Sequence, residues 1–239
     1  MITCILPMAG AGSRFTRAGQ PLPKYAIPAR GRPLLAWALD SLPLALISRL
    51  VLVAQRDAVA QVDPLALLAP ELARRVTELV LLDGLTGGQA DTVLAARAHI
   101  DERGLLVYNC DTHFHAPTLH ARLADPVARA DGVLGSFAGA GTHWSFARVD
   151  AQGTVLETAE KRRISDHCLT GLYHFSRGSD FLLACDQPVQ EAGERYVAPI
   201  YNALIRAGRR FVLDPVARFE PLGTPAELAA FEEARPCAA

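Results

Sequence analysis

A glycine-rich turn near the N-terminus is the first place where this sequence could do chemistry. Residues 10–14, Gly-Ala-Gly-Ser-Arg, follow an apolar run at residues 2–6, and Lys24 comes ten residues after Arg14. Glycines let backbone N–H groups approach an anion, Arg14 can clamp a phosphate with its fork, and Lys24 can stand beside it as a point charge. A dinucleotide-binding turn needs a third Gly where Phe15 stands, and a P-loop needs Gly-Lys-Ser/Thr. The pattern therefore predicts a phosphate site of another type, and a plain strand-to-helix turn is the weaker alternative.

Lysine is rare in this chain. Of its 24 basic residues, only Lys24 and Lys161 are lysines. Because arginine fills the other basic positions, these two sites are predicted to need a compact ammonium that a planar guanidinium cannot replace. Lys161 directly follows Glu160, and such a pair can bind a polyol hydroxyl and an acceptor phosphate. The ordinary alternative for a Glu-Lys pair is a solvated surface, which the scarcity of lysine makes less attractive.

Two more polar segments follow apolar runs. In residues 84–89, Gly-Leu-Thr-Gly-Gly-Gln, the two adjacent glycines before a predicted helix allow a flat ring to lie against backbone, and Gln89 can donate and accept at the edge of a base. Asn109-Cys110-Asp111 ends another apolar run, and a carboxylate there can hold a Mg²⁺ that bridges phosphate oxygens. An isolated Asp at such a place is more often a turn former, so the prediction for Asp111 depends on the phosphate site.

A sheet must position these segments. Over the first 110 residues, short apolar runs alternate with predicted helices in the order 2–6, 33–42, 50–54, 65–75, 78–82, 89–100 and 105–108. This alternation is typical of βαβ units, a mainly parallel sheet and helices on both faces. Ligands bind at the carboxyl ends of strands in such sheets, so residues 10–14, 84–89 and 109–111 are predicted to meet at one edge.

The second half of the chain has shorter strand-like runs separated by polar turns. The predicted strands are 133–137, 144–149, 154–158, 169–175 and 210–214, and the predicted helices are 176–185, 196–207 and 225–234. This half is predicted to extend the same sheet with antiparallel strands and to carry an acceptor-binding lobe.

Composition excludes several classes of protein. The 239 residues carry a net charge of −1 with no basic stripe, so neither nucleic acid nor a membrane surface is an expected partner. No apolar run reaches the ~18 residues of a membrane span, and residues 1–6 are predicted to be a buried strand rather than a signal peptide. The five cysteines are scattered and form no C-x-x-C. We therefore expect a cytoplasmic protein in a reducing compartment, and a homo-oligomer is compatible with the sequence.

Taken together, these segments resemble the NTP-transferase family of nucleotidyltransferases, the sugar-1-phosphate pyrophosphorylases. The resemblance rests on Pro-Met-Ala-Gly-Ala-Gly-Ser-Arg-Phe with Lys24, Thr-x-Gly-Gln-Ala-x-Thr-Val, Asn-Cys-Asp, Glu-Lys and the strand around Gly171. Residues 144–146, 160–165, 196–202 and 222–225 are similar to the short bacterial group associated with capsule and surface polysaccharide. The resemblance covers nearly the whole chain in order.

The resemblance implies a fold and a role for each segment. The fold would be a single Rossmann-like α/β domain of the glycosyltransferase-A type over residues 1–239, with an NTP-binding half at 1–115 and an acceptor-binding half at 116–239. Arg14, Lys24 and Asp111 would be catalytic, and Asp111 would bind Mg²⁺. The implied nucleotide-binding residues are Ala9, Gly10, Gly12, Ser13, Arg14, Gly87, Gly88 and Gln89, and the implied acceptor-binding residues are Asn109, Glu160, Lys161 and Gly171.

One position departs from the family pattern. Many members have a second metal-binding Asp two residues before the Gly of a late Gly-Thr turn, and here that position is Pro221 with Glu220 beside it. Either Glu220 reaches the metal, or Asp111 acts with phosphates and water alone.

The expected reaction transfers a nucleotidyl group from an NTP to a phosphorylated small molecule and releases pyrophosphate. Neither the base nor the acceptor follows from the sequence, and a cytidylyltransferase acting on a non-sugar acceptor is the nearest rival. A metal-dependent glycosyltransferase on the same fold and an NTP-binding module without activity are more distant rivals.

Overall fold

A computed structural model describes residues 1–124, 130–187 and 193–234 of the chain, in which strands and short helices alternate. The first half contains β1 (Ile2–Pro7), α1 (Ser13–Arg17), η1 (Lys24–Ala26), β2 (Pro28–Ala29), β3 (Arg32–Pro33), α2 (Leu34–Asp40), η2 (Leu44–Leu46), β4 (Ile47–Gln55), α3 (Arg56–Gln61), η3 (Pro64–Leu67), α4 (Pro70–Ala73), β5 (Val76–Leu82), α5 (Gln89–Leu94), η4 (Arg97–His99), β6 (Gly104–Tyr108) and β7 (Thr112–His115). The second half contains α6 (Leu119–Ala124), β8 (Gly132–Ala138), β9 (Ser145–Val149), β10 (Val155–Glu160), β11 (His167–Phe175), α7 (Gly178–Cys185), η6 (Ala198–Ile200), α8 (Tyr201–Arg206), β12 (Phe211–Pro215), β13 (Arg218–Pro221) and α9 (Pro225–Glu233).

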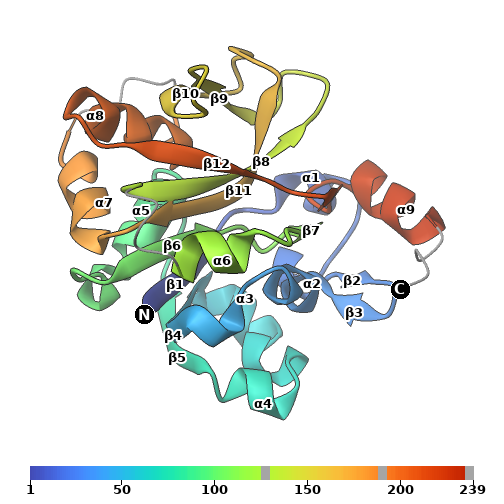
Figure 1. Ribbon diagram of the computed structural model, residues 1–239. Coiled ribbons are helices and arrows are strands. Elements are labelled where there is room, and N and C mark those ends of the chain that lie inside the picture. The colour runs from blue at the N-terminus through green and yellow to red at the C-terminus, as the bar shows by residue number, and fades with distance from the viewer. Residues whose placement is uncertain (125–129, 188–192, 235–239) are drawn as a thin grey trace.

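The first half forms the parallel part of a mixed sheet. Among the described residues, β6, β1, β4 and β5 lie side by side in that order, and all three pairings are parallel. Figure 1 shows helices on both sides of these strands. The four strands are the apolar runs predicted from the sequence, and the mainly parallel α/β arrangement is confirmed.

The second half continues the sheet through β11. This strand runs antiparallel to its neighbours β6, β8 and β9, and β10 pairs antiparallel with β9. The predicted antiparallel extension is therefore confirmed for these strands. The strand β12 is different, because it joins the same sheet parallel to β8.

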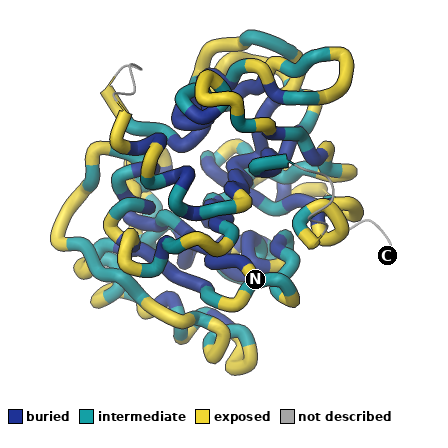
Figure 2. The backbone as a smooth tube through the Cα atoms, turned by 60° about the vertical axis from the view of Figure 1, so that its left-hand side comes forward, coloured by how far each residue is buried: buried dark blue, intermediate teal, exposed yellow. Residues whose placement is uncertain are grey.

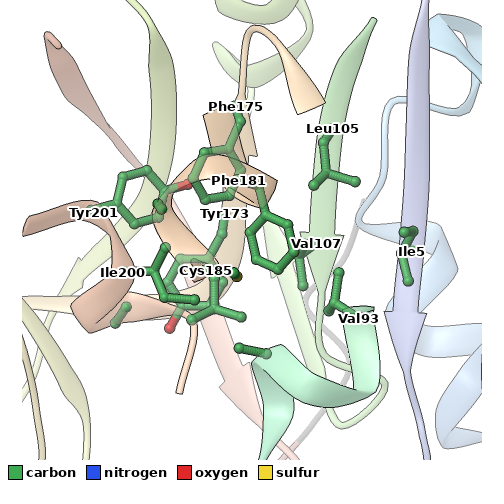
Figure 3. Packing of buried hydrophobic residues seen from close by; sticks show 14 of the residues in the cluster. Ile5, Val93, Leu105, Val107, Tyr173, Phe175, Phe181, Cys185, Ile200 and Tyr201 are labelled. Carbon is green, nitrogen blue, oxygen red and sulfur yellow. The ribbon is translucent and has the colours of Figure 1, made fainter. Parts of the chain in front are cut away.

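Both faces of the sheet are buried, which explains the apolar strands. Along β1, β4 and β6, successive side chains point to opposite faces, so each face receives every second residue. One face includes Val53 together with Ile5 and Val107, which Figure 3 labels, and all three are fully buried against the layer that contains α5, α7 and α8. The other includes Leu6 and Leu52, which pack with the layer that contains α2 and α3. Figure 2 shows this buried interior beneath exposed loops.

One predicted helix is divided by a proline, and another contains a proline in its first turn. Residues 65–75 form η3 and then α4, because Pro70 has no N–H to continue a helix and holds Ala69 in an extended conformation (φ −57°, ψ 144°). Residues 196–207 form the short turn η6, which contains Pro199, followed by α8. The helix predicted over 89–100 is also shorter, since α5 ends at Leu94 and η4 follows separately.

A small two-stranded sheet was not predicted. β7 and β13 pair antiparallel, with His113 opposite Glu220 and Thr112 opposite Pro221. The pairing joins segments about a hundred residues apart and brings the end of β13 beside Asp111, whose carbonyl oxygen accepts a hydrogen bond from the Leu222 N–H (2.8 Å). In the described ranges, no helix has the length and apolar character needed to cross a membrane.

His174 is a polar residue buried in β11. Its side chain is only 6% exposed, and its Nδ1 has no hydrogen-bond partner within the described structure. Burial lowers the pKa of His174 to about 4, because the imidazolium would lose its hydration. The folded protein therefore holds this ring neutral at neutral pH.

We expect the stability of the fold to fall as the pH drops below about 6.5, the pKa of an unfolded histidine. Between that pH and about 4 the unfolded chain binds a proton that folded His174 does not, which costs about 2 kcal/mol between pH 7 and pH 5. Urea unfolding at both pH values measures the loss. His174→Gln, which cannot titrate, should show a loss smaller by that amount, and equal losses in the two proteins would contradict the assignment.

Candidate active site

A cleft of about 510 Å³ lies at the carboxyl ends of the parallel strands. It is lined by parts of all four segments singled out in the sequence: residues 9–14 with Lys24, residues 85–86 and 88–89, residues 109–111, and residues 160–161 with Gly171. Lys24 and Lys161, which lie 137 positions apart in the sequence, thus open into the same space. The predicted meeting of the strand-end segments at one edge of the sheet is confirmed.

The loop after β1 presents backbone rather than side chains to the cleft. Gly12 has a left-handed conformation (φ 61°), and a Cβ built on Gly10 would meet no atom within 4 Å. In the described structure, no protein oxygen accepts a hydrogen bond from the N–H groups of Gly10, Ala11 or Gly12. These donors and the exposed Arg14 beside them can therefore face the oxygens of a phosphate chain.

Tyr25, the residue after Lys24 in η1, anchors this turn beside the cleft. Tyr25 is buried, and its hydroxyl donates to the carbonyl oxygens of Ala58 (2.9 Å) and Val62 (2.6 Å). The Lys24 ammonium then forms an ion pair with the Asp111 carboxylate. Burial lowers the pKa of Lys24, but the charge and hydrogen bond of Asp111 more than offset this, so the pKa lies above its usual value. Lys24 is therefore a cation at any physiological pH.

The residue between Asn109 and Asp111 does not supply a nucleophile. Burial raises the pKa of the Cys110 thiol to about 12, so the thiolate form is absent near neutral pH. Among the described residues the cleft also contains no Ser-His pair within hydrogen-bonding distance. The chemistry of this site consists of positioning and charge.

Gln89, Asn109 and Gly171 meet on one wall of the cleft. The Gln89 side chain donates through Nε2 to Asn109 Oδ1. Gly171 has φ 86°, and a Cβ there would lie 2.3 Å from Asn109 Nδ2. Glycine at 171 therefore leaves the space that the Asn109 amide occupies, and Asn109 in turn orients Gln89.

Glu160 is the last residue of β10, Lys161 follows it, and both line the cleft. Glu160 accepts a hydrogen bond from Ser145 Oγ, which lies 3.1 Å from the hydroxyl of Tyr173. Lys161 donates to the hydroxyl of Tyr196 and has φ 51°, a conformation that few residues with a Cβ adopt. Such backbone strain persists where surrounding contacts hold it, and it is concentrated at functional sites.

Two predicted site residues do not line the cleft. Gly87 lies behind it, and a Cβ on Gly87 would stand 2.5 Å from Asp91 Oδ2. Glu220 points away because side chains alternate along β13: Phe219 and Pro221 face the cleft, and Glu220 faces His113 (2.7 Å) and Arg218 (3.1 Å). The alternative in which Glu220 reaches a metal at Asp111 is therefore wrong for this structure.

A different carboxylate lies near Asp111. A Cβ on Gly223 would stand 2.7 Å from Asp111 Oδ2 and 3.5 Å from Glu227 Oε2, so both carboxylates approach the same point, and both residues line the cleft. Glu227 lies in the first turn of α9, where its N–H donates to Thr224 Oγ1 (3.2 Å). The spacing Thr-x-x-Glu is a helix-start pattern that could have located this residue from the sequence, but only as a capping residue.

Several further residues of the cleft were not assigned roles from the sequence. They include Trp144, Ser145, Tyr173, Glu194, Tyr196 and Phe219. They come from four separate parts of the second half, and no shared spacing connects them.

The fold and the cleft define an α/β protein with a glycine-lined, charged cleft at the ends of its parallel strands. A family model described as a MobA-like NTP transferase domain matches residues 4–170. This match covers more than half of the chain, and the chain therefore belongs to the MobA-like NTP transferase domain family. It is a nucleotidyltransferase.

Solved structures agree with this assignment. The nucleoside-diphosphate-sugar pyrophosphorylase from Vibrio cholerae RC9 is 34% identical with a TM-score of 0.81, covering 98% of this chain and 100% of that one. A putative glucose-1-phosphate thymidylyltransferase from Bacillus anthracis, solved with sucrose, has a TM-score of 0.80 at 16% identity, covering 100% of this chain and 98% of that one. A UDP-glucose pyrophosphorylase solved with UDP-glucose has a TM-score of 0.82 at 15% identity, covering 97% of each chain. No curated protein matches the sequence.

Proposed function

We propose that this nucleotidyltransferase transfers NMP from an NTP to a sugar 1-phosphate or a similar phosphorylated small molecule and releases pyrophosphate. The observation that carries the proposal is the meeting of Lys24, Asp111 and Lys161 in one cleft, because two phosphorylated substrates need cations from both sides. The 34% identical relative is described as a nucleoside-diphosphate-sugar pyrophosphorylase, which supports a sugar phosphate as the acceptor.

The reaction needs no nucleophile from the protein. An oxygen of the acceptor phosphate is already anionic, and it attacks the α-phosphorus of the NTP. A bond forms between this oxygen and the α-phosphorus, the bond from the α-phosphorus to the bridging oxygen breaks, and its electron pair leaves with pyrophosphate. Catalysis then depends on alignment of the two phosphates and on neutralisation of their charge.

The first half of the chain, residues 1–115, holds the NTP in this proposal. The backbone of Ala9, Gly10, Gly12 and Ser13 surrounds the phosphate chain, and Arg14 binds the oxygens of the leaving pyrophosphate. Lys24 stabilises the charge on the α-phosphate during attack. Gln89, held by Asn109, reads the edge of the base, with Gly88 beside it and Gly87 supporting the loop from behind.

The second half, residues 116–239, holds the acceptor. Lys161 binds the acceptor phosphate, and Glu160 accepts hydrogen bonds from hydroxyl groups. Ser145 and Tyr173, which contact Glu160 and each other, fix its orientation. Asn109 and Gly171 complete the binding site between the two substrates.

Mg²⁺ fits the carboxylates of this cleft. Asp111 and Glu227 would hold it, since Mg²⁺ is usually bound through one or two carboxylates with substrate phosphates and water in the remaining positions. When bound, the ion supplies positive charge to the phosphate oxygens. In the structure Lys24 pairs with Asp111, and its flexible stem allows the ammonium to turn from this carboxylate to a phosphate oxygen.

The product would be an activated precursor of surface polysaccharide made in the cytoplasm. The motifs at residues 144–146, 160–165, 196–202 and 222–225 support this assignment through their similarity to the capsule-associated group.

A panel of ATP, GTP, CTP, UTP and dTTP against phosphorylated sugars, polyols and choline phosphate tests the proposal. Pyrophosphate release with a sugar 1-phosphate and Mg²⁺ is the expected result. Preference for a non-sugar acceptor would establish the cytidylyltransferase alternative. Turnover of a nucleotide sugar without pyrophosphate would indicate a glycosyltransferase, and binding of an NTP without any turnover would overturn the enzymatic proposal.

We expect Lys24→Ala to lower kcat by about a hundredfold, because loss of one donor aimed at transition-state charge costs roughly 3 kcal/mol. Lys24→Arg should also be impaired, since a guanidinium is larger and planar. Steady-state kinetics of both variants measure the effect, with circular dichroism as the control for folding. Near-normal turnover of folded Lys24→Ala would show that the role assigned to this ammonium is wrong.

Removal of either proposed carboxylate should weaken the binding of a divalent cation. We expect Asp111→Asn and Glu227→Gln each to raise the Kd for Mn²⁺ at least about tenfold in the presence of the preferred NTP. Paramagnetic resonance of free Mn²⁺ measures this without turnover. Glu220→Gln is the matched control, because Glu220 contacts His113 and Arg218 instead. An effect of Glu220→Gln equal to that of Glu227→Gln would contradict the assignment.

A further inference from the structure

Arg195 stands between two residues that line the cleft, Glu194 and Tyr196, and its backbone is hydrogen-bonded to the loop that precedes α5. The Arg195 N–H donates to the Gly87 carbonyl oxygen (2.9 Å), and the Ala90 N–H donates to the Arg195 carbonyl oxygen (2.8 Å). These two bonds join residues more than a hundred positions apart. They hold the loop that carries Gln89 against a segment of the second half.

The close approach of these two segments requires glycine at position 88. A Cβ on Gly88 would stand 2.3 Å from the Arg195 nitrogen and 2.6 Å from its carbonyl oxygen, which no real contact allows. Gly88 also has φ 152°. The backbone of Arg195 therefore explains why position 88 must be glycine.

The Arg195 side chain fastens the same contact. Its Nη1 lies 3.1 Å from Asp91 Oδ1 in the first turn of α5, and its Nη2 donates to the carbonyl oxygen of Cys185 at the end of α7. Both members of the Arg195–Asp91 pair are about two-thirds shielded, with side chains 28% and 32% exposed. The guanidinium thus joins the helix that follows the nucleotide loop to a helix of the second half.

The next residue reaches the acceptor side. Tyr196 accepts a hydrogen bond from the Lys161 ammonium, which also lies 4.5 Å from the centre of the Tyr196 ring. The pKa of Lys161 lies above its usual value. Burial lowers this pKa, but the hydrogen bond to Tyr196 and the nearby charges of Glu160 and Glu194 more than offset the effect of burial. The next two residues, Val197 and Ala198, are fully buried in the core. The Thr158 hydroxyl of β10 donates a hydrogen bond to the Ala198 carbonyl oxygen (2.6 Å).

We propose that Arg195 is a positioning residue that couples the two substrate sites, holding the Gly87–Ala90 loop through its backbone and guanidinium while Tyr196 holds Lys161. The naming of the two sites rests on the proposed function, whereas the coupling rests on the contacts. If the guanidinium is lost, Gln89 and Lys161 should both lose their fixed positions. A merely local role would disturb only the loop around Gly88.

Hydrogen–deuterium exchange tests this coupling without any substrate. We expect Arg195→Ala and the milder Asp91→Asn to speed exchange at least about fivefold in peptides covering 84–92 and 158–163, since contacting residues are energetically coupled. Arg49→Ala is the matched control, because the Arg49–Asp101 pair has a similar distance (3.2 Å) and exposure (31% and 39%) away from the cleft. It should change neither peptide.

Kinetics provide a second measurement. With the NTP and acceptor that release most pyrophosphate in the substrate panel, Arg195→Ala should raise the KM for both substrates about tenfold and change kcat by less than about twofold. Arg195→Lys retains a cation near Asp91 and should recover most of the loss. Arg49→Ala should leave both KM values unchanged.

Faster exchange in residues 84–92 alone, or a KM change for the NTP alone, would overturn the coupling and leave Arg195 with a local structural role. Unchanged exchange in both peptides of Arg195→Ala and Asp91→Asn would overturn it as well. Failure of the proposed function is a separate outcome, since it would appear as absence of turnover by the wild-type protein in the panel.

Discussion

The ion pair between Lys24 and Asp111 is the contact on which the site depends. A cleft proposed to bind two phosphorylated molecules needs cations, and a partly buried ammonium needs a carboxylate beside it to stay charged. Asp111 provides that carboxylate at the end of β6, and Tyr25 anchors η1 so that Lys24 reaches it. The pair keeps Lys24 charged in a partly buried place, where an ammonium alone would tend to lose its proton.

The sheet brings the other groups to this ion pair. β1 and β6 are parallel neighbours, so the glycine loop after β1 and Asn109–Asp111 after β6 emerge at the same edge. β11 runs antiparallel beside β6, and its left-handed residue Gly171 gives the Asn109 amide its space. One pairing of strands thus joins the proposed nucleotide side of the cleft to the proposed acceptor side.

Charge in the cleft is balanced by acids from distant segments. Glu160, Glu194 and Glu227 line the same space as Lys24 and Lys161, and they come from β10, the segment before η6, and α9. Because acids and bases line the same space, an incoming phosphate can replace a carboxylate as the partner of an ammonium. This arrangement suits a reaction in which the negative charge passes from the acceptor phosphate to pyrophosphate.

The sequence by itself determined the features that depend on short-range rules. Alternating apolar runs predicted β1, β4, β5 and β6, and glycines and the two lysines marked the loops of the cleft, because strand burial and turn geometry are local properties. The helix predicted at 65–75 is divided, because Pro70 has no N–H group to donate within a helix, and the helix predicted at 89–100 ends at Leu94. These errors concern local structure and leave the site intact.

Only the tertiary structure decided which carboxylate stands beside Asp111. Glu220 is nearer in sequence to the expected position, but the pairing of β13 with β7 turns it toward His113 and places the start of α9, with Glu227, at the cleft. The same holds for Gly88 and Arg195, whose contact joins the two halves of the chain. The face of a strand that a side chain occupies, and the contacts between segments distant in sequence, depend on long-range pairing of strands and loops. The local spacing of residues does not encode this pairing.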